Sequence, residues 1–103
     1  MPEFTNPFAV LANDRKLTKD ELIRAIRFNI AAEYEAIQMY VQLAESTSDK
    51  LAAEVLKDIA EEEVVHAGEF LRLLKYLSPN EEKLYQQGYA EVEEEIKKLK
   101  KSK

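Results

Sequence analysis

Hydrophobic side chains recur at helical spacing along two long stretches of the sequence. The first series of positions is Ile23, Ile26, Ile30, Glu33, Ile37, Tyr40 and Ala44, and the second is Ala52, Leu56, Ile59, Glu63, His66, Phe70, Leu73 and Leu77. All are apolar or aromatic except Glu33, Glu63 and His66, which fall at the same spacing. Steps that alternate between three and four residues keep these positions on one face of an α-helix. The pattern therefore predicts two long helices, each with a face that must be buried.

Capping signals indicate where these two helices begin and end. Thr18 and Glu21 have the spacing of a capping box, and the apolar series begins directly after them. The first helix is therefore predicted to run from about 19 to 46. Short polar residues at 46–49 interrupt the apolar repeat and favour helix caps over helix interiors. The second helix is predicted to run from about 49 to 77.

A third helix is predicted to begin near residue 79. Ser78 and Glu81 repeat the capping-box pattern, and Pro79 would occupy the first helical position. The apolar positions of this helix are Leu84, Tyr85, Tyr89, Val92, Ile96 and Leu99. In its second half an acidic stretch at 91–95 is followed by a lysine tail, an order that suits the dipole of a solvated helix.

The chain thus divides into three segments. Residues 1–17 form an N-terminal arm, in which Phe4 and Phe8 are expected to dock on another surface. Residues 18–78 form a helical hairpin, and residues 79–103 form a C-terminal helix with a basic tail. The link between the first two helices is too short for a crossover. We therefore expect an all-α protein built on an antiparallel two-helix hairpin.

Three ionisable residues occupy positions in the apolar series, namely Glu33, Glu63 and His66. The turn lies close to residue 48, and Glu33 and Glu63 are each fifteen residues away from it. The two glutamates should therefore face each other across the hairpin, with His66 one turn further along. Burial of a charge is costly unless the charge is paired or binds a metal. The three residues are accordingly predicted to bind a metal ion.

Composition narrows the kinds of metal site and partner. The 103 residues include no cysteine, which excludes thiolate zinc sites and iron–sulfur clusters within the chain. A net charge of -5 argues against a nucleic-acid partner, which would need a basic face. No apolar run approaches the roughly 18 residues of a membrane span. The first residues lack the order of a secretory signal, so we expect a cytoplasmic protein.

One chain carries half of a known type of metal site. Oxygen and nitrogen ligands favour iron, with manganese or zinc as substitutes. A carboxylate-bridged di-iron centre takes one Glu from each of two helices and a Glu-x-x-His motif from each of two others. His66 is the only histidine, so two chains related by a two-fold axis would complete the set. The prediction is a homodimer whose four long helices form a four-helix bundle.

Three further polar residues near these positions have two interpretations each. Tyr40 lies two turns after Glu33, where its hydroxyl would either serve the metal centre or be a core tyrosine with a partner elsewhere. Glu35 and Glu62 fall off the apolar faces. Each is either a solvated acid or a residue that draws cations toward the centre.

Two segments, Ala32–Tyr40 and Glu61–Ala67, together resemble the encapsulated ferritins, which are short ferritin-like proteins packaged in encapsulin shells. The resemblance covers about residues 19–95. Rubrerythrin-like proteins share its Glu and Glu-x-x-His elements. The resemblance implies a di-iron ferroxidase centre at a subunit interface, assembly of dimers into a ring such as a decamer, and enclosure in an encapsulin nanocompartment.

The same resemblance implies roles for individual residues. Glu33, Glu63 and His66 would ligate iron, Glu35 would match an acidic residue on the path of the metal, and Tyr40 would match a tyrosine beside the centre. Ala32 departs from relatives that carry an acid at that position.

The resulting functional prediction is a ferroxidase that oxidises Fe(II) to Fe(III) for iron storage. One alternative is a rubrerythrin-like di-iron peroxidase, against which the lack of a cysteine-based electron relay counts. The other alternative is a non-catalytic helical oligomerisation module. In that module Glu63 and His66 would only form hydrogen bonds, since short Glu-x-x-His strings also occur by chance in helices.

Overall fold

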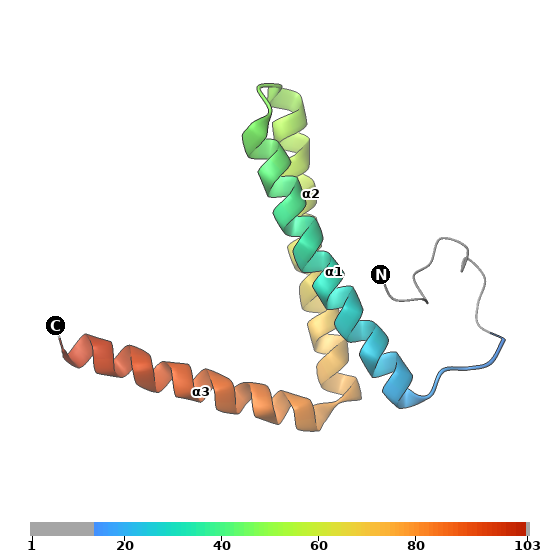
Figure 1. Ribbon diagram of the computed structural model, residues 1–103, viewed down its shortest axis with the longest axis vertical. Coiled ribbons are helices and arrows are strands. Elements are labelled where there is room, and N and C mark those ends of the chain that lie inside the picture. Colours follow the sequence, from blue (N-terminus) through green and yellow to red (C-terminus); the bar gives the residue numbers. More distant parts are fainter. Residues whose placement is uncertain (1–13, 103) are drawn as a thin grey trace.

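Three α-helices account for nearly all of residues 14–102, the part of the chain that the computed structural model describes (Figure 1). They are α1 (Lys19–Ser46), α2 (Lys50–Leu77) and α3 (Pro79–Lys101). No strand occurs in this range, which confirms the all-α prediction. None of the three helices has both the length and the apolar character needed to cross a membrane. The docking expected of Phe4 and Phe8 concerns residues outside the described range.

The N-terminal end of α1 has the predicted capping box. The Glu21 amide donates a hydrogen bond to Thr18 Oγ1 at 3.2 Å, and the Thr18 amide donates to Glu21 Oε1 at 2.8 Å. The Arg15 guanidinium also donates to both oxygens of Glu21, at 2.8 and 2.7 Å. Arg15 is the main reason why the pKa of Glu21 falls to about 2. The predicted start of the first helix is therefore confirmed.

The turn between α1 and α2 is made by a few polar residues. Thr47 has an extended backbone and ends α1, and Asp49 caps α2 by accepting a hydrogen bond from the Ala52 amide at 2.9 Å. The two helices then run antiparallel, side by side over their whole length (Figure 1). This arrangement is the predicted hairpin.

The seam between the two helices follows the predicted face of α1 and only part of the predicted face of α2. The buried residues are Ile23, Ile26, Ile30 and Ala44 on α1 and Ala60, Ala67 and Leu74 on α2. Small alanines at a seven-residue spacing let the two helices approach closely. Of the predicted series on α2, Phe70 and Leu77 pack against the core cluster, whereas His66 and Leu73 are exposed. A single neighbouring helix covers only a narrow stripe, so the flank of α2 with His66 and Leu73 lacks cover from the rest of residues 14–102.

The N-terminal end of α3 differs from the prediction. Pro79 stands in the first turn as expected, but the Ser78 side chain does not cap the helix. The Glu81 carboxylate instead accepts hydrogen bonds from Arg27 of α1 and Tyr85 of α3, and Ser78 Oγ donates to it at 3.4 Å. We call these four residues the elbow cluster. The second capping box was a wrong prediction because a cationic donor on another helix competes for the glutamate.

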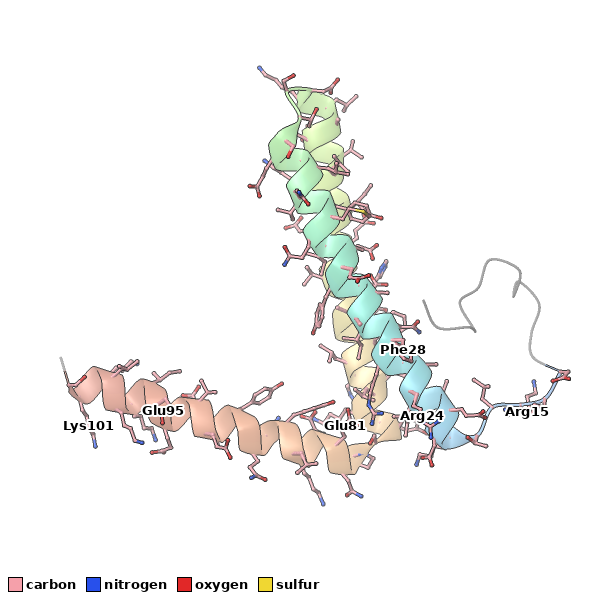
Figure 2. All side chains as sticks on the ribbon, in the orientation of Figure 1. Arg15, Arg24, Phe28, Glu81, Glu95 and Lys101 are labelled. Atoms are coloured by element: carbon pink, nitrogen blue, oxygen red, sulfur yellow. The ribbon has the colours of Figure 1, made fainter. Side chains whose placement is uncertain are left out.

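Beyond the elbow cluster, α3 projects away from the hairpin (Figures 1 and 2). No residue of α3 is buried, and its apolar side chains range from 37% exposed at Tyr85 to 67% at Leu84. Figure 2 shows the side chains of the outer part of α3, toward Glu95 and Lys101, standing out from the helix with no other element beside them. Its apolar face is therefore uncovered by any other part of residues 14–102.

Candidate metal centre

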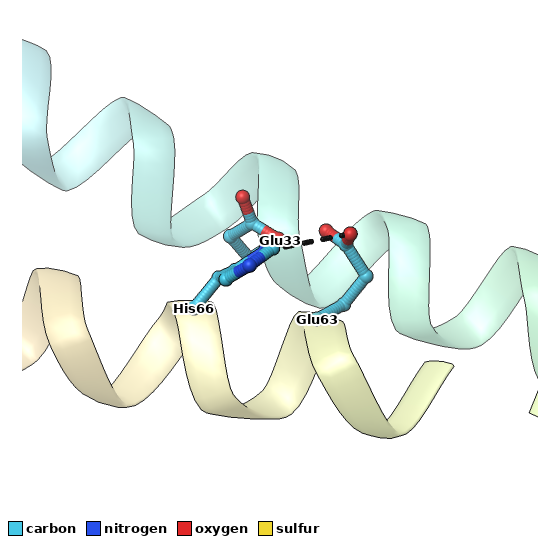
Figure 3. Close-up of side chains that lie close together, drawn as sticks. All are labelled: Glu33, Glu63 and His66. Carbon is cyan, nitrogen blue, oxygen red and sulfur yellow. Dashed lines mark ion pairs between the residues drawn. The ribbon is translucent and has the colours of Figure 1, made fainter. Parts of the chain in front are cut away.

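Glu33 of α1 and the pair Glu63 and His66 of α2 face one another across the hairpin (Figure 3). One ligand atom from each residue lies within 4.8 Å of those of the other two. The expectation that equal distances from the turn bring these residues together is therefore confirmed. The three form the one group of this kind found among residues 14–102.

The helical spacing of Glu63 and His66 sets the geometry on α2. Residues three apart lie on the same face of a helix. His66 Nδ1 and Glu63 Oε1 are 3.6 Å apart, as the dashed line in Figure 3 marks. The Glu63 side chain is 20% exposed, whereas that of His66 is 49% exposed. The expectation that all three residues point into a packed seam is thus wrong for His66, because α1 does not reach over it.

Glu33 is held in an unfavourable electrostatic environment. Its Oε2 atom is buried and has no hydrogen-bond partner among residues 14–102. The pKa of Glu33 is raised, first by the Glu63 carboxylate with which it would share a proton and then by burial, while His66 opposes the shift. A buried acceptor without a donor is unfavourable. A divalent cation between the two carboxylates would satisfy the orphaned oxygen and remove the repulsion.

A cavity of about 340 Å³ adjoins two of the three residues, Glu33 and His66. Its lining consists of Glu33, His66, Glu69 and Phe70. Sequence reasoning did not single out Glu69. The available signal was its position three residues after His66, which places it on the same face of α2.

The remaining predicted site residues lie outside this cluster. Tyr40 is half-buried, and its hydroxyl makes no hydrogen bond within residues 14–102. Glu35 and Glu62 are exposed, and neither lines the cavity. None of the three residues belongs to the group of possible ligands.

The donor set fits a first-row divalent metal ion. Two carboxylates and an imidazole provide oxygen and nitrogen ligands, which suit Fe(II) and Mn(II) and also accept Zn(II). Three ligands that are open on one side leave room for further ligands. The set from one chain is half of that in a carboxylate-bridged di-metal centre.

Comparison with known proteins identifies related chains. The sequence profile of the rubrerythrin family matches residues 7–102. A ferritin-like–encapsulin shell fusion protein of Pyrococcus furiosus is 38% identical over 89 residues, which are 86% of this chain and 26% of the relative. The encapsulin nanocompartment cargo protein EncC of Myxococcus xanthus is 41% identical over 81 residues, which are 79% of this chain and 61% of the relative. The chain thus spans less than two thirds of either relative.

The fold also matches a solved structure. The crystal structure of the encapsulated ferritin domain from Pyrococcus furiosus superposes with a TM-score of 0.78 at 38% sequence identity. The match covers 86% of this chain and 90% of that domain. The arrangement of three helices described above is therefore that of an encapsulated ferritin domain.

Proposed function

The chain belongs to the rubrerythrin family of ferritin-like proteins, and on that premise we propose that it is a ferroxidase. Its substrate is Fe(II), which it binds between Glu33, Glu63 and His66 and oxidises to Fe(III). The observation that carries this proposal is the convergence of the three ligand atoms within 4.8 Å around the unpartnered Glu33 oxygen. If Glu33 had only a structural role, its buried Oε2 atom would remain without a hydrogen-bond partner or a metal ion.

The active unit of this proposal is a homodimer. Each chain offers two carboxylates and one imidazole, so two chains joined at this face would hold two iron ions among four glutamates and two histidines. The flank of α2 that α1 leaves uncovered supports this pairing, because His66 and Leu73 both lie on it and both are exposed. Further dimers would assemble into a ring, for which a decamer is the proposed form.

The ligands account for the direction of the reaction. Two Fe(II) release two electrons, and dioxygen accepts them with two protons to form hydrogen peroxide. Glu63 and His66 hold the substrate from one helix, and Glu33 positions it from the other. Hard carboxylate oxygens bind a trivalent ion more strongly than a divalent one, so they favour oxidation.

We propose an encapsulin shell as the partner that stores the product. The Pyrococcus relative carries such a shell in the same chain, and the Myxococcus relative is a cargo protein of one. In residues 14–102, the hairpin and its projecting helix enclose no space for a mineral core. Storage would therefore occur in the nanocompartment around the ferroxidase.

The proposal is tested by mixing Fe(II) with the assembled protein in air and following Fe(III) absorbance. Glu63→Ala and His66→Ala should each lower the initial rate by at least about 100-fold, since even the loss of residues that only support a ligand costs about 10–100-fold. Glu62→Ala is the matched control. It removes an exposed carboxylate next to Glu63 and should leave the rate unchanged.

Two results would contradict the proposal. Wild-type rates in Glu63→Ala or His66→Ala would show that oxidation occurs elsewhere. Full activity in a metal-loaded monomer, detected by native mass spectrometry, would exclude the shared centre.

The family description favours one second candidate, a di-iron peroxidase of the rubrerythrin type. That activity would need an external electron donor, because the chain has no cysteine for a relay. Peroxide consumption with and without a reductase and its electron carrier separates the two candidates. A peroxidase would turn over only with the donor, whereas a ferroxidase would consume Fe(II) without it.

A further inference from the structure

The cavity beside the candidate centre contains one carboxylate that the centre does not use. Its lining consists of two proposed ligands, Glu33 and His66, together with Phe70 and Glu69. Phe70 packs against the core cluster and has no polar side-chain atom. Glu69 lies outside the group of ligand atoms that are within 4.8 Å of one another, so its role is unassigned.

Glu69 belongs to the flank of α2 that the proposed dimer covers. His66, Glu69 and Leu73 follow one another at steps of three and four residues, which places them on one side of the helix. His66 and Leu73 are the exposed residues that mark this flank. In the single chain Glu69 is exposed as well, so water can solvate its carboxylate. A second chain over this flank would remove that water.

A carboxylate that is taken out of water needs a hydrogen-bond donor. Within residues 14–102 the Glu69 carboxylate takes part in no hydrogen bond or ion pair. Of the side chains that line the cavity, His66 is the one with ring N–H groups to donate. It lies one helical turn before Glu69, and long side chains on a helix lean toward the helix N-terminus, which is the direction of His66.

The imidazole of His66 has the complementary requirement. Its Nδ1 atom faces Glu63 Oε1 at 3.6 Å, on the side of the candidate centre. Its Nε2 atom forms no hydrogen bond within residues 14–102. A histidine that binds a metal through one ring nitrogen almost always donates its other N–H to a carboxylate, a backbone carbonyl or water. Since Glu33 is a proposed ligand, Glu69 is the remaining carboxylate of the cavity for this contact.

Resting on the proposed function, we propose that Glu69 accepts a hydrogen bond from the Nε2–H of His66 when two chains close over the cavity. The bond keeps the proton on Nε2, so Nδ1 presents its lone pair to the metal ion. The negative charge of Glu69 also makes Nδ1 more basic and therefore a stronger ligand. Glu69 is thus a positioning residue that acts through His66, and this role needs no access to solvent.

NMR of the histidine ring tests the hydrogen bond directly. His66 is the only histidine, so nitrogen-15 labelling of histidine reports this one ring. The sample is the assembled protein loaded with Zn(II), which is diamagnetic and accepts the same ligands. In the wild type, Nε2 should carry a proton that exchanges slowly with water. In Glu69→Ala that exchange should be at least about tenfold faster, because a hydrogen bond to a charged acceptor has been lost.

The affinity for Zn(II) gives a second measurement. Glu69→Ala should weaken it by about 10–100-fold, the usual effect of removing the partner of a metal-binding histidine, with no change in the number of ions bound per chain. Glu69→Gln keeps an acceptor oxygen without the charge, so it should lie between Glu69→Ala and the wild type in both measurements.

Glu61→Ala is the matched control for these variants. It also removes an exposed carboxylate from α2, five residues before His66. Five residues along a helix lead to a different face, and Glu61 does not line the cavity. Both the exchange rate and the Zn(II) affinity of this variant should match the wild type.

Four results would overturn the inference. A wild-type exchange rate or a wild-type Zn(II) affinity in Glu69→Ala would show that the hydrogen bond is absent. Fewer Zn(II) ions bound per chain in that variant would make Glu69 a ligand. Loss of the assembled mass of that variant at saturating Zn(II) would make Glu69 a contact between copies. Equal weakening by Glu61→Ala would show a general effect of charge.

Failure of the proposed function has a different signature. The metal site would be wrong if Glu63→Ala bound Zn(II) as the wild type does, and the ferroxidase would be wrong if that variant oxidised Fe(II) at the wild-type rate. Neither measurement involves a Glu69 variant. Absence of Zn(II) binding in the wild type would overturn both proposals. Circular dichroism of each variant checks that the helices are intact.

Discussion

The hairpin and α3 have similar apolar periodicity but are stabilised in different ways. The hairpin buries a line of side chains between two helices, and Leu74 in that line is 3% exposed. In α3 no residue is buried, and Leu99 is 64% exposed. The side-chain hydrogen bonds and ion pairs that join α3 to α1 within residues 14–102 are those between Arg27 and Glu81. One helix pair therefore has a core, whereas α3 is held at its base by polar contacts.

This difference shows how the molecule separates folding from assembly. Buried apolar contacts within the chain give the hairpin its stability and bring the ligands together. The apolar face of α3 gains nothing from burial in the single chain and remains available for contacts with other molecules. The following predictions test this contrast from the largest expected effect to the smallest.

Leucine truncation should separate the two regions most clearly. Leu74→Ala should lower the free energy of unfolding by about 2–4 kcal/mol, because it opens a cavity in the seam. Leu99→Ala should change it by less than about 0.5 kcal/mol, since the side chain is already exposed. Urea unfolding of metal-free protein at low concentration measures both. Equal costs would show that α3 is packed as tightly as the hairpin.

Glu33→Gln should stabilise the metal-free hairpin but weaken its binding of a metal ion. Removal of one charge, with an amide that donates to Glu63, should stabilise the metal-free protein by about 1 kcal/mol. The variant should also lose the stabilisation that a bound cation gives the wild type, about 2.7 kcal/mol at one hundred times the dissociation constant. Thermal unfolding with chelator and with Mn(II) measures both effects. Glu35→Gln is the control and should change neither quantity.

The elbow cluster should control the orientation of α3, and its loss should cost less free energy than the loss of Leu74 from the seam. Glu81→Gln should weaken the attachment by about 1 kcal/mol, since Arg27 is half exposed and its ion pair is screened. The chain has no cysteine, so spin labels on cysteines introduced at Arg24 and Glu95 can report the distance between α1 and α3. The distance distribution should broaden in Glu81→Gln. Glu82→Gln, which affects a hydrogen bond to Gln86 within α3, should leave it unchanged.

The same measurement should depend on pH in a known direction. Arg27 is the main cause of the lowered pKa of Glu81, whose ordinary value is 4.5. Because the folded pKa is the lower one, the attachment is fully present above about 4.5 and weakens as the pH falls through the lowered value. The wild-type distribution should therefore broaden on acidification. A similar response in Glu81→Gln would assign the effect to other groups.

The sequence anticipated features that depend on short stretches of chain. The capping box at Thr18 and Glu21, the polar turn before Asp49, and the start of α3 at Pro79 all occur as expected. The facing positions of Glu33 and Glu63 also followed from equal distances to the turn. These features depend on local hydrogen bonds and helical geometry, which a short stretch of sequence specifies.

The sequence did not predict which distant segments contact one another. The repeat on α2 identified an apolar face but not which line of it meets α1, so the alanines Ala60 and Ala67 were missed. Glu81 was expected to cap its own helix and instead pairs with Arg27, 54 residues away. Glu69 lines a cavity that forms only when the helices are packed.

By itself, the sequence determined three helices, their ends, and the level at which two carboxylates and an imidazole meet, because periodicity and capping act within a few residues. Only the tertiary structure decided which helix faces are covered, that His66 stays half exposed, and that α3 is held by the elbow cluster. The physical reason is that burial and charge pairing depend on neighbours from other parts of the chain, and these neighbours are defined only once the helices pack.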